Sequence, residues 1–467
     1  MRGKGESFDG ISEELANEDA RLWHHILGVH PHEEPDFTRA GGSSMDAVDL
    51  QLAIQSSLGL KLPFEAVNED TTYEDILSAL ATASAVNTVP DDVRASDSDL
   101  HATPAQISQW IIESGDPGSS KYSVPILVRF RSAVDQNILS NAVTKVVRAH
   151  SALRTTVRPV DQAKDRFIQV VHPAPEAFPV EHRSIASLSD SDVSSVLKEL
   201  LKTPPSIIAP SVMRAVALHI EDTILGLLFV VQHAAVDEWS IRVMLEDLHA
   251  ALQGKEVHSD AGSAISGSHD LENTPDTWWE DELSTLPPEI DFPNLTNTVG
   301  LHVDLSDALS PEDVARLDKT CRDIGVELAT AVIHSSARAV NSVLERPLEK
   351  LAVSVPITVR SDFRDERAMG MHLNTLPVPV VLDGSGLEAA LLSTRASVKA
   401  VQQRKQSSYR SLISNYASHR IGGRDPWLDI MVGFVDRPLY ACDLFESEMP
   451  STIDSAAPVL ILARRTT

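Results

Sequence analysis

Residues 84–102 show no hydrophobic repeat and divide this chain into two parts that differ in the spacing of their apolar residues. The segment is rich in Ala, Ser and Asp, contains Pro90, and shows neither the helical nor the strand period. Before it, apolar residues recur at helical spacing alone, whereas strand-like and helix-like runs alternate after it. With 467 residues the chain is also too long for one average core, so we expect two folding units joined by a linker.

Residues 11–83 are predicted to form a small all-α domain. Three apolar faces at helical spacing are present, around Trp23, Met45 and Ile76. The first two helices are joined by a loop in which Gly41 and Gly42 permit backbone geometries that other residues avoid. We expect this loop to lie close to whatever the next helix carries.

Ser44 stands at the start of the second of these helices, between Ser43 and Met45. Free backbone N–H groups and the helix dipole favour negative charge at that place, so Ser44 could carry a phosphodiester. A glycine turn followed by a serine N-cap gives the same run of residues without any function. These residues alone leave both interpretations open.

Strand-like and helix-like runs alternate after the linker, and this alternation predicts an α/β unit. We divide the unit into an N-terminal lobe, 103–275, and a C-terminal lobe, 276–467. Strands are expected over residues 122–131, 213–220 and 224–231. The last of them is nearly all apolar, as in a strand that is covered on both faces. In the C-terminal lobe, Ser310 is predicted as the N-cap of a helix that turns Leu317 and Cys321 inward.

Polar residues follow the apolar strand closely and form the second candidate site: Gln232, His233, Asp237, Trp239 and Ser240. A neutral imidazole at His233 could accept a proton from an attacking amine. A lone histidine after a strand is more often structural, and an aspartate placed like Asp237 more often holds its loop through an arginine. Ser240 is predicted as the N-cap of the helix that follows.

The segment around Ser44 resembles the peptidyl or acyl carrier domains of nonribosomal peptide synthetases, which implies a four-helix fold for residues 11–83. Their usual motif reads Leu-Gly-Gly-(His/Asp)-Ser-Leu, and Ala40-Gly-Gly-Ser-Ser-Met45 takes its place here. The resemblance implies that Ser44 carries 4'-phosphopantetheine, with Ser43 as a neighbouring second hydroxyl. It also implies three kinds of partner: a phosphopantetheinyl transferase, a separate adenylation enzyme that charges the arm, and neighbouring carrier domains.

Residues 103–435 resemble the condensation domains of the same synthetases, whose α/β fold has two chloramphenicol-acetyltransferase-like lobes. Five motifs of that family occur in the family's order. They are Thr103-Pro-Ala-Gln106 with Trp110, Ala149-His-Ser-Ala-Leu-Arg154-Thr-Thr-Val157, Gln232-His233-Ala-Ala-Val-Asp237-Glu-Trp-Ser240, Met369-Gly-Met-His-Leu-Asn374-Thr-Leu-Pro-Val378 and Asp425-Pro-Trp-Leu-Asp429-Ile-Met431. Five motifs in order are more specific than any one of them.

The resemblance assigns roles to the candidate residues. His233 takes the place of the dominant catalytic histidine, which positions the acceptor, stabilises the tetrahedral intermediate or acts as base. Asp237 belongs to the same catalytic loop and is held by Arg154 or Arg360. The remaining residues are expected to support the site: Gln232, Trp239 and Ser240 in the loop, and Asn374 near the tunnel between the lobes.

Two substitutions depart from the family motif. Gln232 replaces a first histidine, and Glu238 replaces a glycine after Asp237. If that backbone position needs a positive φ, Glu238 would be strained there. The chain also ends soon after the apolar run 459–463, where family members usually add a strand and a helix, so we expect a shortened C-terminal lobe.

The resemblance implies an acyltransferase: an aminoacyl or peptidyl group, held as a thioester on phosphopantetheine, passes to an amine and forms an amide. An alcohol acceptor would give an ester instead, and the loop does not discriminate the two. A degenerate, non-catalytic interaction module is another alternative, which Gln232 and Glu238 favour somewhat. An epimerase lacks its accompanying glutamate motif here, and an acetyltransferase that uses free coenzyme A leaves residues 11–83 unexplained.

Composition limits the kinds of partner that we expect this chain to bind. A formal net charge of −27 opposes binding to nucleic acid and to anionic lipid, both of which select basic surfaces. Two cysteines, Cys321 and Cys442, supply neither a disulfide framework nor the spacing of a metal site, and Cys321 is expected to be a buried, inert thiol. The first residues lack a signal peptide's apolar run and no long uncharged segment could span a bilayer, so we expect a cytoplasmic protein.

Overall fold

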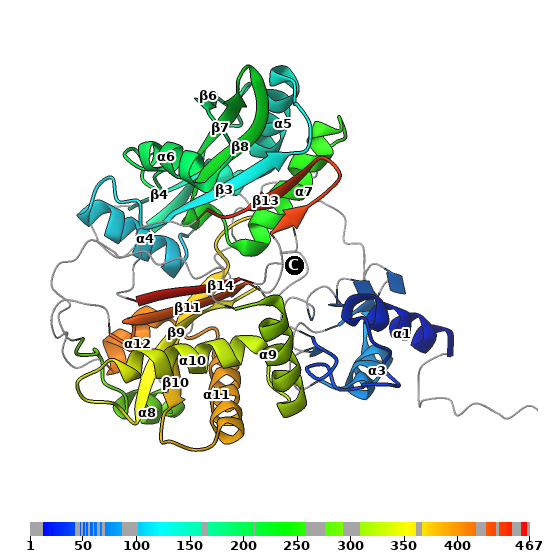
Figure 1. The fold of residues 1–467 in the computed structure, drawn as a ribbon, viewed down its shortest axis with the longest axis vertical. Helices are drawn as coiled ribbons and strands as arrows, with labels where there is room; N and C mark the ends of the chain where they lie inside the picture. Colours follow the sequence, from blue (N-terminus) through cyan, green and yellow to red (C-terminus); the bar gives the residue numbers. More distant parts are fainter. Residues whose placement is uncertain are drawn as a thin grey trace, which may run out of the picture.

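In the computed structural model, a mainly helical N-terminal region is followed by an α/β region (Figure 1). The residues that it describes are 13–42, 47, 50–51, 53–54, 57–58, 60–62, 66–67, 71–85, 101–159, 167–209, 211–257, 276–292, 309–360, 367–416, 426–435, 439–450 and 459–464. Ser44, most of the predicted helix around it and most of the predicted linker lie outside them.

The N-terminal region packs around the apolar faces of two helices, α1 (Glu13–Leu27) and α3 (Tyr73–Thr82). Trp23 and Ile76, one from each helix, are fully buried together with Phe37 of the intervening loop. The short strands β1 (Leu60–Lys61) and β2 (Ser84–Ala85) pair beside them. The first and third predicted helices are therefore confirmed.

The loop that leads to Ser44 depends on both of its glycines. Gly41 has a φ of 94°, which residues with a Cβ rarely adopt. A Cβ on Gly42 would lie 2.4 Å from the Phe37 ring, so that glycine is required by close packing. The expected unusual backbone geometry is confirmed for Gly41, whereas Gly42 is required by its packing against Phe37.

We predict that Gly42→Ala destabilises the N-terminal region by about 1–3 kcal/mol, the usual cost of overpacking a core. Phe37 is buried, and its ring would have to move to admit the methyl group. Hydrogen exchange of peptides from residues 13–42 and 71–85 measures the loss. Gly115→Ala is the matched control, because a Cβ there would meet nothing within 4 Å. Equal protection in both variants would contradict the packing argument.

Asp19 makes the stability of this region depend on pH. Burial raises the pKa of Asp19 from 3.8 to about 7, and the hydroxyl of Tyr73 lowers it only in part. A carboxyl with a raised folded-state pKa contributes its full stability below the unfolded pKa and loses it as the pH rises through about 7.

We therefore predict that Asp19→Asn protects the N-terminal region at pH 8 by a few kcal/mol relative to the parent chain and changes little near pH 4. Exchange rates of the two chains are compared at the same pH, which cancels the intrinsic pH dependence of exchange. An equal difference at both pH values would contradict the assignment of a raised pKa to Asp19.

The N-terminal lobe of the α/β unit is built on a six-stranded sheet in the order β12-β13-β3-β8-β7-β6. Its first four strands along the chain are β3 (Ser123–Phe130), β6 (Val180–Ile185), β7 (Met213–Ile220) and β8 (Thr223–Gln232). Pairing is antiparallel except between β6 and β7. The three strands predicted in this lobe are confirmed.

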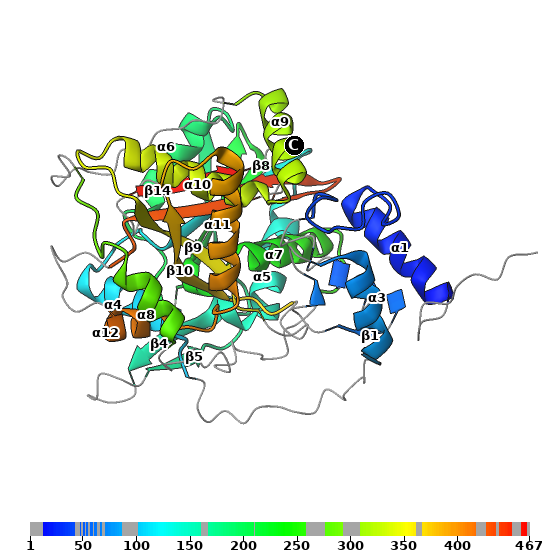
Figure 2. The ribbon, with the colours of Figure 1, turned by 90° about the horizontal axis from the view of Figure 1, so that it is seen from below.

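Strand β8 is apolar throughout because both faces of the sheet are covered. Leu227 and Phe229 face the cluster that contains residues of α5 (Gln136–Ala149) and α7 (Glu238–Leu252). Leu228 and Val230 face the opposite cluster, with residues of α6 (Asp190–Leu200). Helices α5 and α7 lie side by side (Figure 2).

A smaller group of elements packs under the end of β8. Helix α4 (Pro104–Gly115) begins with a capping box between Thr103 and Gln106. The hairpin β4 (Thr155–Pro159) and β5 (Phe167–Val171) follows η2 (Ser151–Arg154). Ala234, just after β8, is buried among residues of this group.

The C-terminal lobe has a four-stranded sheet in the order β10-β9-β11-β14. Its strands are β9 (Lys350–Thr358), β10 (Leu373–Val381), β11 (Ile430–Val435) and β14 (Val459–Arg464). Its helices are α8 (Thr277–Ser284), α9 (Pro311–Ile324), α10 (Leu328–Ser342), α11 (Leu387–Gln402) and α12 (Tyr409–Tyr416).

Helix α9 begins where the sequence predicts and packs less than predicted. Ser310 is its N-cap, in a capping box with Asp313, and Cys321 is buried. The expected inward position of Leu317 is wrong, because its side chain is 42% exposed. Only the C-terminal turn of α9 joins an apolar cluster, so the apolar repeat extends beyond the buried part of the helix.

One segment late in the chain crosses from the C-terminal lobe into the sheet of the N-terminal lobe. Strands β12 (Tyr440–Ala441) and β13 (Phe445–Glu448) come after β11 in the chain, yet β13 pairs with β3 of the N-terminal lobe (Figure 1). Phe445 is fully buried in the core of that lobe. The polypeptide then returns to β14, which pairs with β11.

Among the described helices none is both long enough and apolar enough to cross a membrane.

Candidate functional site

His233 begins the short helix η3 (His233–Ala235) directly after β8. Its backbone N–H donates to the Tyr122 carbonyl (2.7 Å), which fixes the start of the loop beside β3. Its ring Nδ1 lies 2.9 Å from the Val236 carbonyl oxygen. A carbonyl can only accept, so Nδ1 carries the proton and the lone pair of the neutral ring is on Nε2. The local backbone thus selects the tautomer in which Nε2 is the proton-accepting nitrogen.

Asp237 is 3% exposed and is bound from both lobes. Its carboxylate accepts two hydrogen bonds from Arg360 Nη2 (2.9 and 3.0 Å) and one from the His372 backbone N–H (3.1 Å). Burial by itself raises the pKa of Asp237, but the Arg360 guanidinium, His372 and the Ser240 donors outweigh it and hold the pKa below its usual value. Asp237 is therefore an ionised anchor with no proton to give.

Arg360, rather than Arg154, is the arginine that binds Asp237. Arg154 instead donates to main-chain carbonyls, among them Val147 (3.1 Å) and His172. The expectation that either arginine could hold the loop is thus resolved: Arg154 lies at the start of β4, whereas Arg360 follows β9 and reaches across the lobe interface.

Ser240 is fully buried one turn into α7 and is not its N-cap, contrary to the sequence prediction. The cap is Asp237, which accepts from the Ser240 backbone N–H (2.7 Å). The Ser240 hydroxyl donates to Asp237 (2.6 Å) and accepts from the Gly370 N–H (3.0 Å). The predicted cap is displaced because Asp237 is itself a good cap and α7 starts at Glu238.

Gln232 is buried and serves the loop with its amide. Its carbonyl oxygen accepts from the Ala234 N–H (2.8 Å), which caps η3, and its amide nitrogen donates to Glu113 of α4 (3.3 Å). Glu113 also accepts from the Ile207 N–H (3.1 Å). Gln232 therefore ties the loop that contains His233 to α4.

The two residues after Asp237 continue the helix without strain. Glu238 occupies the first turn of α7, and the only described non-glycine residues with positive φ are Glu221 and Trp427. A glutamate in the first turn also complements the helix dipole. Trp239 is half-buried against the core of the N-terminal lobe, with Arg242 5.7 Å from its ring centroid. The strain considered for Glu238 is absent.

Asn374 lies on β10 and points toward the end of α11. Its amide donates to the Lys405 and Ser407 carbonyls (2.8 and 2.7 Å). Those bonds hold a turn inside the C-terminal lobe. Asn374 is thus separate from the group formed by His233, Asp237 and Arg360, although β10 begins close to His372.

Sequence reasoning missed several residues that join the lobes. Gly370, with a φ of 150°, and the His372 N–H contact α7, and Met369 is buried in the core of the N-terminal lobe. Arg367 donates to Asp247 of α7 (2.6 Å), which in turn binds His150 (2.8 Å). The motif over residues 369–378 contains Met369, Gly370 and His372, but its sequence does not show that they reach the other lobe.

Ser44 lies outside the described residues, so only its flank can be compared with the needs of a phosphopantetheine arm. The loop ending at Gly42 packs on the buried Phe37 ring, and its last two residues, Gly41 and Gly42, carry no side chains. That flank fits a covalent arm. The same loop lies against the end of α9: a Cβ on Gly41 would be 3.6 Å from Arg322 Nη1 (Figure 1).

Comparison with known families covers both regions. Residues 97–454 match the family described as the condensation domain, and residues 20–80 match the phosphopantetheine attachment site. The second match supplies the prosthetic group of the N-terminal region, 4'-phosphopantetheine.

Curated relatives are long synthetases. The beauvericin nonribosomal cyclodepsipeptide synthetase of Gibberella fujikuroi is 24% identical over 428 residues, which are 84% of this chain and 13% of that protein. The phosphinothricin tripeptide synthetase PhsB of Streptomyces viridochromogenes is 23% identical, over 86% of this chain and 35% of its own length. The chain thus spans a small part of either relative.

Solved structures share the fold. The first condensation domain of the calcium-dependent antibiotic synthetase, in complex with a substrate analogue, has a TM-score of 0.63 at 16% identity, covering 79% of this chain and 89% of that domain. The X-domain from teicoplanin biosynthesis, in its complex with OxyB, has a TM-score of 0.60 at 16% identity, covering 80% and 86%. With the family match over most of the chain, the conclusion is that this protein belongs to the condensation-domain family and, as in nonribosomal peptide synthetases, joins a phosphopantetheine carrier domain to a condensation domain.

Proposed function

We propose that the chain is a catalytically competent carrier–condensation unit, in which an aminoacyl or peptidyl group on Ser44 passes to an amine. The observation that carries this proposal is the hydrogen bond from His233 Nδ1 to the Val236 carbonyl, which leaves Nε2 as a proton acceptor. When attached, the phosphopantetheine arm supplies the acyl group as a thioester, whose cleavage drives amide formation.

His233 would act at Nε2 by accepting a proton from the attacking amine or by orienting it. We give Asp237 no role in proton transfer, because its carboxylate already accepts hydrogen bonds from Arg360, Ser240 and the His372 N–H. We assign it the role of fixing α7 and the C-terminal lobe around His233. Gln232, which cannot titrate, holds the loop to α4.

A transfer assay tests the proposal. Ser44 is loaded from acyl-coenzyme A by a permissive phosphopantetheinyl transferase, and the N-acetylcysteamine thioester of glycine is offered as the amine. The expected product is the N-acylglycyl thioester, detected by mass spectrometry, and it requires Ser44. Hydrolysis alone, with no amide above the level of the Ser44→Ala chain, would contradict an amide-forming role.

An ester-forming variant of this function is favoured by one finding, the relative that is named a cyclodepsipeptide synthetase. The same loaded chain is therefore offered the thioester of glycolate, which has a hydroxyl where glycine has an amine. Faster product formation from glycolate would assign the alcohol as the natural acceptor. His233 Nε2 would accept a proton from either group.

A non-catalytic interaction module is the second candidate. The fold likeness to an X-domain that is found in a complex with OxyB favours it, as do Gln232 and Glu238 in the motif. We rank the interaction module below the enzyme for two reasons. Gln232 and Glu238 fit the loop without strain, and His233 keeps the tautomer in which Nε2 can accept a proton.

The wider setting follows from the same proposal. A phosphopantetheinyl transferase, a separate adenylation enzyme and neighbouring carrier domains would supply the arm, the acyl group and the acceptor. We place this work in the cytoplasm, with which two free cysteines, Cys321 and Cys442, agree.

A further inference from the structure

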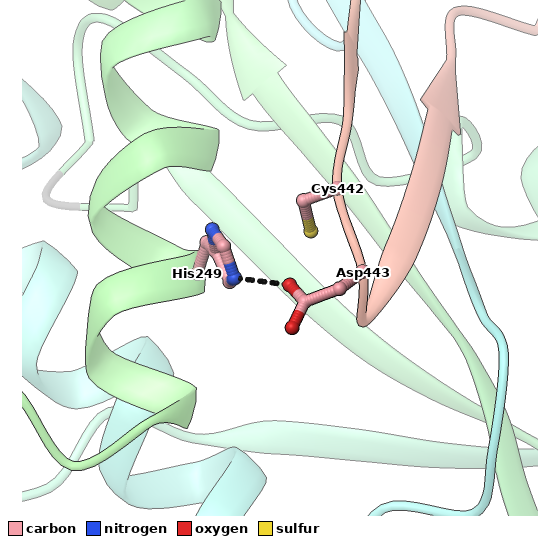
Figure 3. Close-up of side chains that lie close together, drawn as sticks. All are labelled: His249, Cys442 and Asp443. Carbon is pink, nitrogen blue, oxygen red and sulfur yellow. Dashed lines mark hydrogen bonds and ion pairs between the residues drawn. The ribbon is translucent and has the colours of Figure 1, made fainter.

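A group of three metal-ligating side chains lies where α7 meets the turn between β12 and β13 (Figure 3). His249 extends from the last turn of α7, and Cys442 and Asp443 come from the turn. One imidazole nitrogen, the thiol sulfur and one carboxylate oxygen all lie within 4.8 Å of one another. Sequence spacing could not indicate this group, because 194 positions separate His249 from Asp443.

The three donors match one metal ion in particular. Imidazole, thiolate and carboxylate are the ligands of zinc, at bond lengths of about 2.0–2.3 Å. A thiolate ligand disfavours magnesium and calcium, which take oxygen donors. Tetrahedral zinc separates its ligand atoms by about 3.5 Å, so the group must contract by about 1 Å. His249 Nε2 and Asp443 Oδ1 are already 2.8 Å apart.

The surroundings of His249 suit a metal ligand. Its Nδ1 lies 3.1 Å from the Tyr440 hydroxyl. When Nε2 binds the ion, Nδ1–H can donate a hydrogen bond to that hydroxyl, which fixes the ring with its Nε2 lone pair toward the group.

The group is reachable from solvent. The Asp443 side chain is 70% exposed and that of His249 is 20% exposed. Water can therefore occupy a fourth position on the ion. The Gln253 amide, now 2.9 Å from His249 Nε2, lies on the exposed side and would swing away when the ion binds.

We propose that His249, Cys442 and Asp443 bind one zinc ion, with water as the fourth ligand. Binding releases the thiol proton of Cys442 to solvent and breaks the hydrogen bond between His249 and Asp443. The ion joins α7, whose first residue follows Asp237, to the turn that carries β13 into the N-terminal lobe. The ion stabilises the position of the β12–β13 segment in the N-terminal lobe. This structural role does not depend on the proposed acyl transfer.

Titration of the metal-free chain with Co²⁺ alone tests the site. One equivalent should produce a thiolate-to-cobalt charge-transfer band and tetrahedral visible bands, and an equivalent of Zn²⁺ should remove both. Zinc should also slow hydrogen exchange in residues 439–450. A spectrum without a charge-transfer band, in the folded parent chain, would overturn the proposal without any variant.

Variants then assign the ligands. Cys442→Ser should abolish the charge-transfer band, and His249→Gln should weaken Zn²⁺ binding by at least about tenfold, since even outer partners of zinc ligands contribute about 10–100-fold in affinity. Cys321→Ser is the matched control, because Cys321 is the other free thiol and is buried elsewhere. A band that survives in Cys442→Ser, or disappears only in Cys321→Ser, would also overturn the proposal.

Discussion

Replacing His233 with alanine is expected to lower the rate of amide formation by about 10²–10⁴-fold, the usual contribution of a positioned general base or acid. The substitution removes Nε2 and the Nδ1 hydrogen bond to the Val236 carbonyl. It keeps the hydrogen bond from the His233 N–H to the Tyr122 carbonyl, because the backbone makes it. The readout is single-turnover transfer from loaded Ser44 to the glycine thioester.

Loading of Ser44 should be unchanged in this variant, since the carrier region does not contain His233. His182→Ala serves as the matched control: His182 is an exposed histidine on β6 of the same lobe, and its loss should not alter transfer. A His233→Ala chain that transfers as fast as the parent would remove the catalytic role of His233 and favour the interaction module.

Replacing Arg360 with methionine should destabilise the interface between the lobes by about 3–5 kcal/mol, as expected when a buried ion pair loses one partner. Both side chains are nearly buried, with 8% of Arg360 and 3% of Asp237 exposed, so the carboxylate would be left uncompensated. Hydrogen exchange in rising urea, read on peptides of α7 and β10, measures the effect. Adding Asp237→Asn to Arg360→Met should recover part of the loss.

The sign of the pH dependence follows from the same ion pair. Because the pKa of Asp237 is lowered in the folded chain, its contribution is present at neutral pH and is lost as the pH falls below the ordinary carboxyl range. Arg316→Met is the control, because its ion pair with Asp313 is on the surface and exposed pairs contribute only about 0–1 kcal/mol. Equal losses in the Arg360 and Arg316 variants would contradict the role given to Arg360.

Local patterns predicted the elements that local physics determines. Strand β8 was expected from its continuous apolar run, and the N-cap of α9 from Ser310 with proline after it. Such features depend on neighbours within a few positions. The fold class also followed from ordered motifs, because each motif marks one place in a known topology.

The parts that could not be predicted depend on which elements meet in space. Asp237 and Arg360 are 123 positions apart, and only the packing of the two lobes, which brings Arg360 to Asp237, selects Arg360 over Arg154. The exposure of Leu317 depends on how little of α9 the rest of the lobe covers. The helix start at Glu238 was missed because Asp237 and Ser240 are both good N-cap residues, and their sequence does not rank them.

The intact-protein mass of the acyl-loaded chain, followed over time with the glycine thioester present, tests the central claim most directly. The account predicts that the parent chain gains one acyl-phosphopantetheine and then loses only the acyl mass as amide appears, and that Ser44→Ala gains nothing. A parent chain that accepts no arm, or that keeps its acyl group for as long as the His233→Ala chain does, would contradict the account.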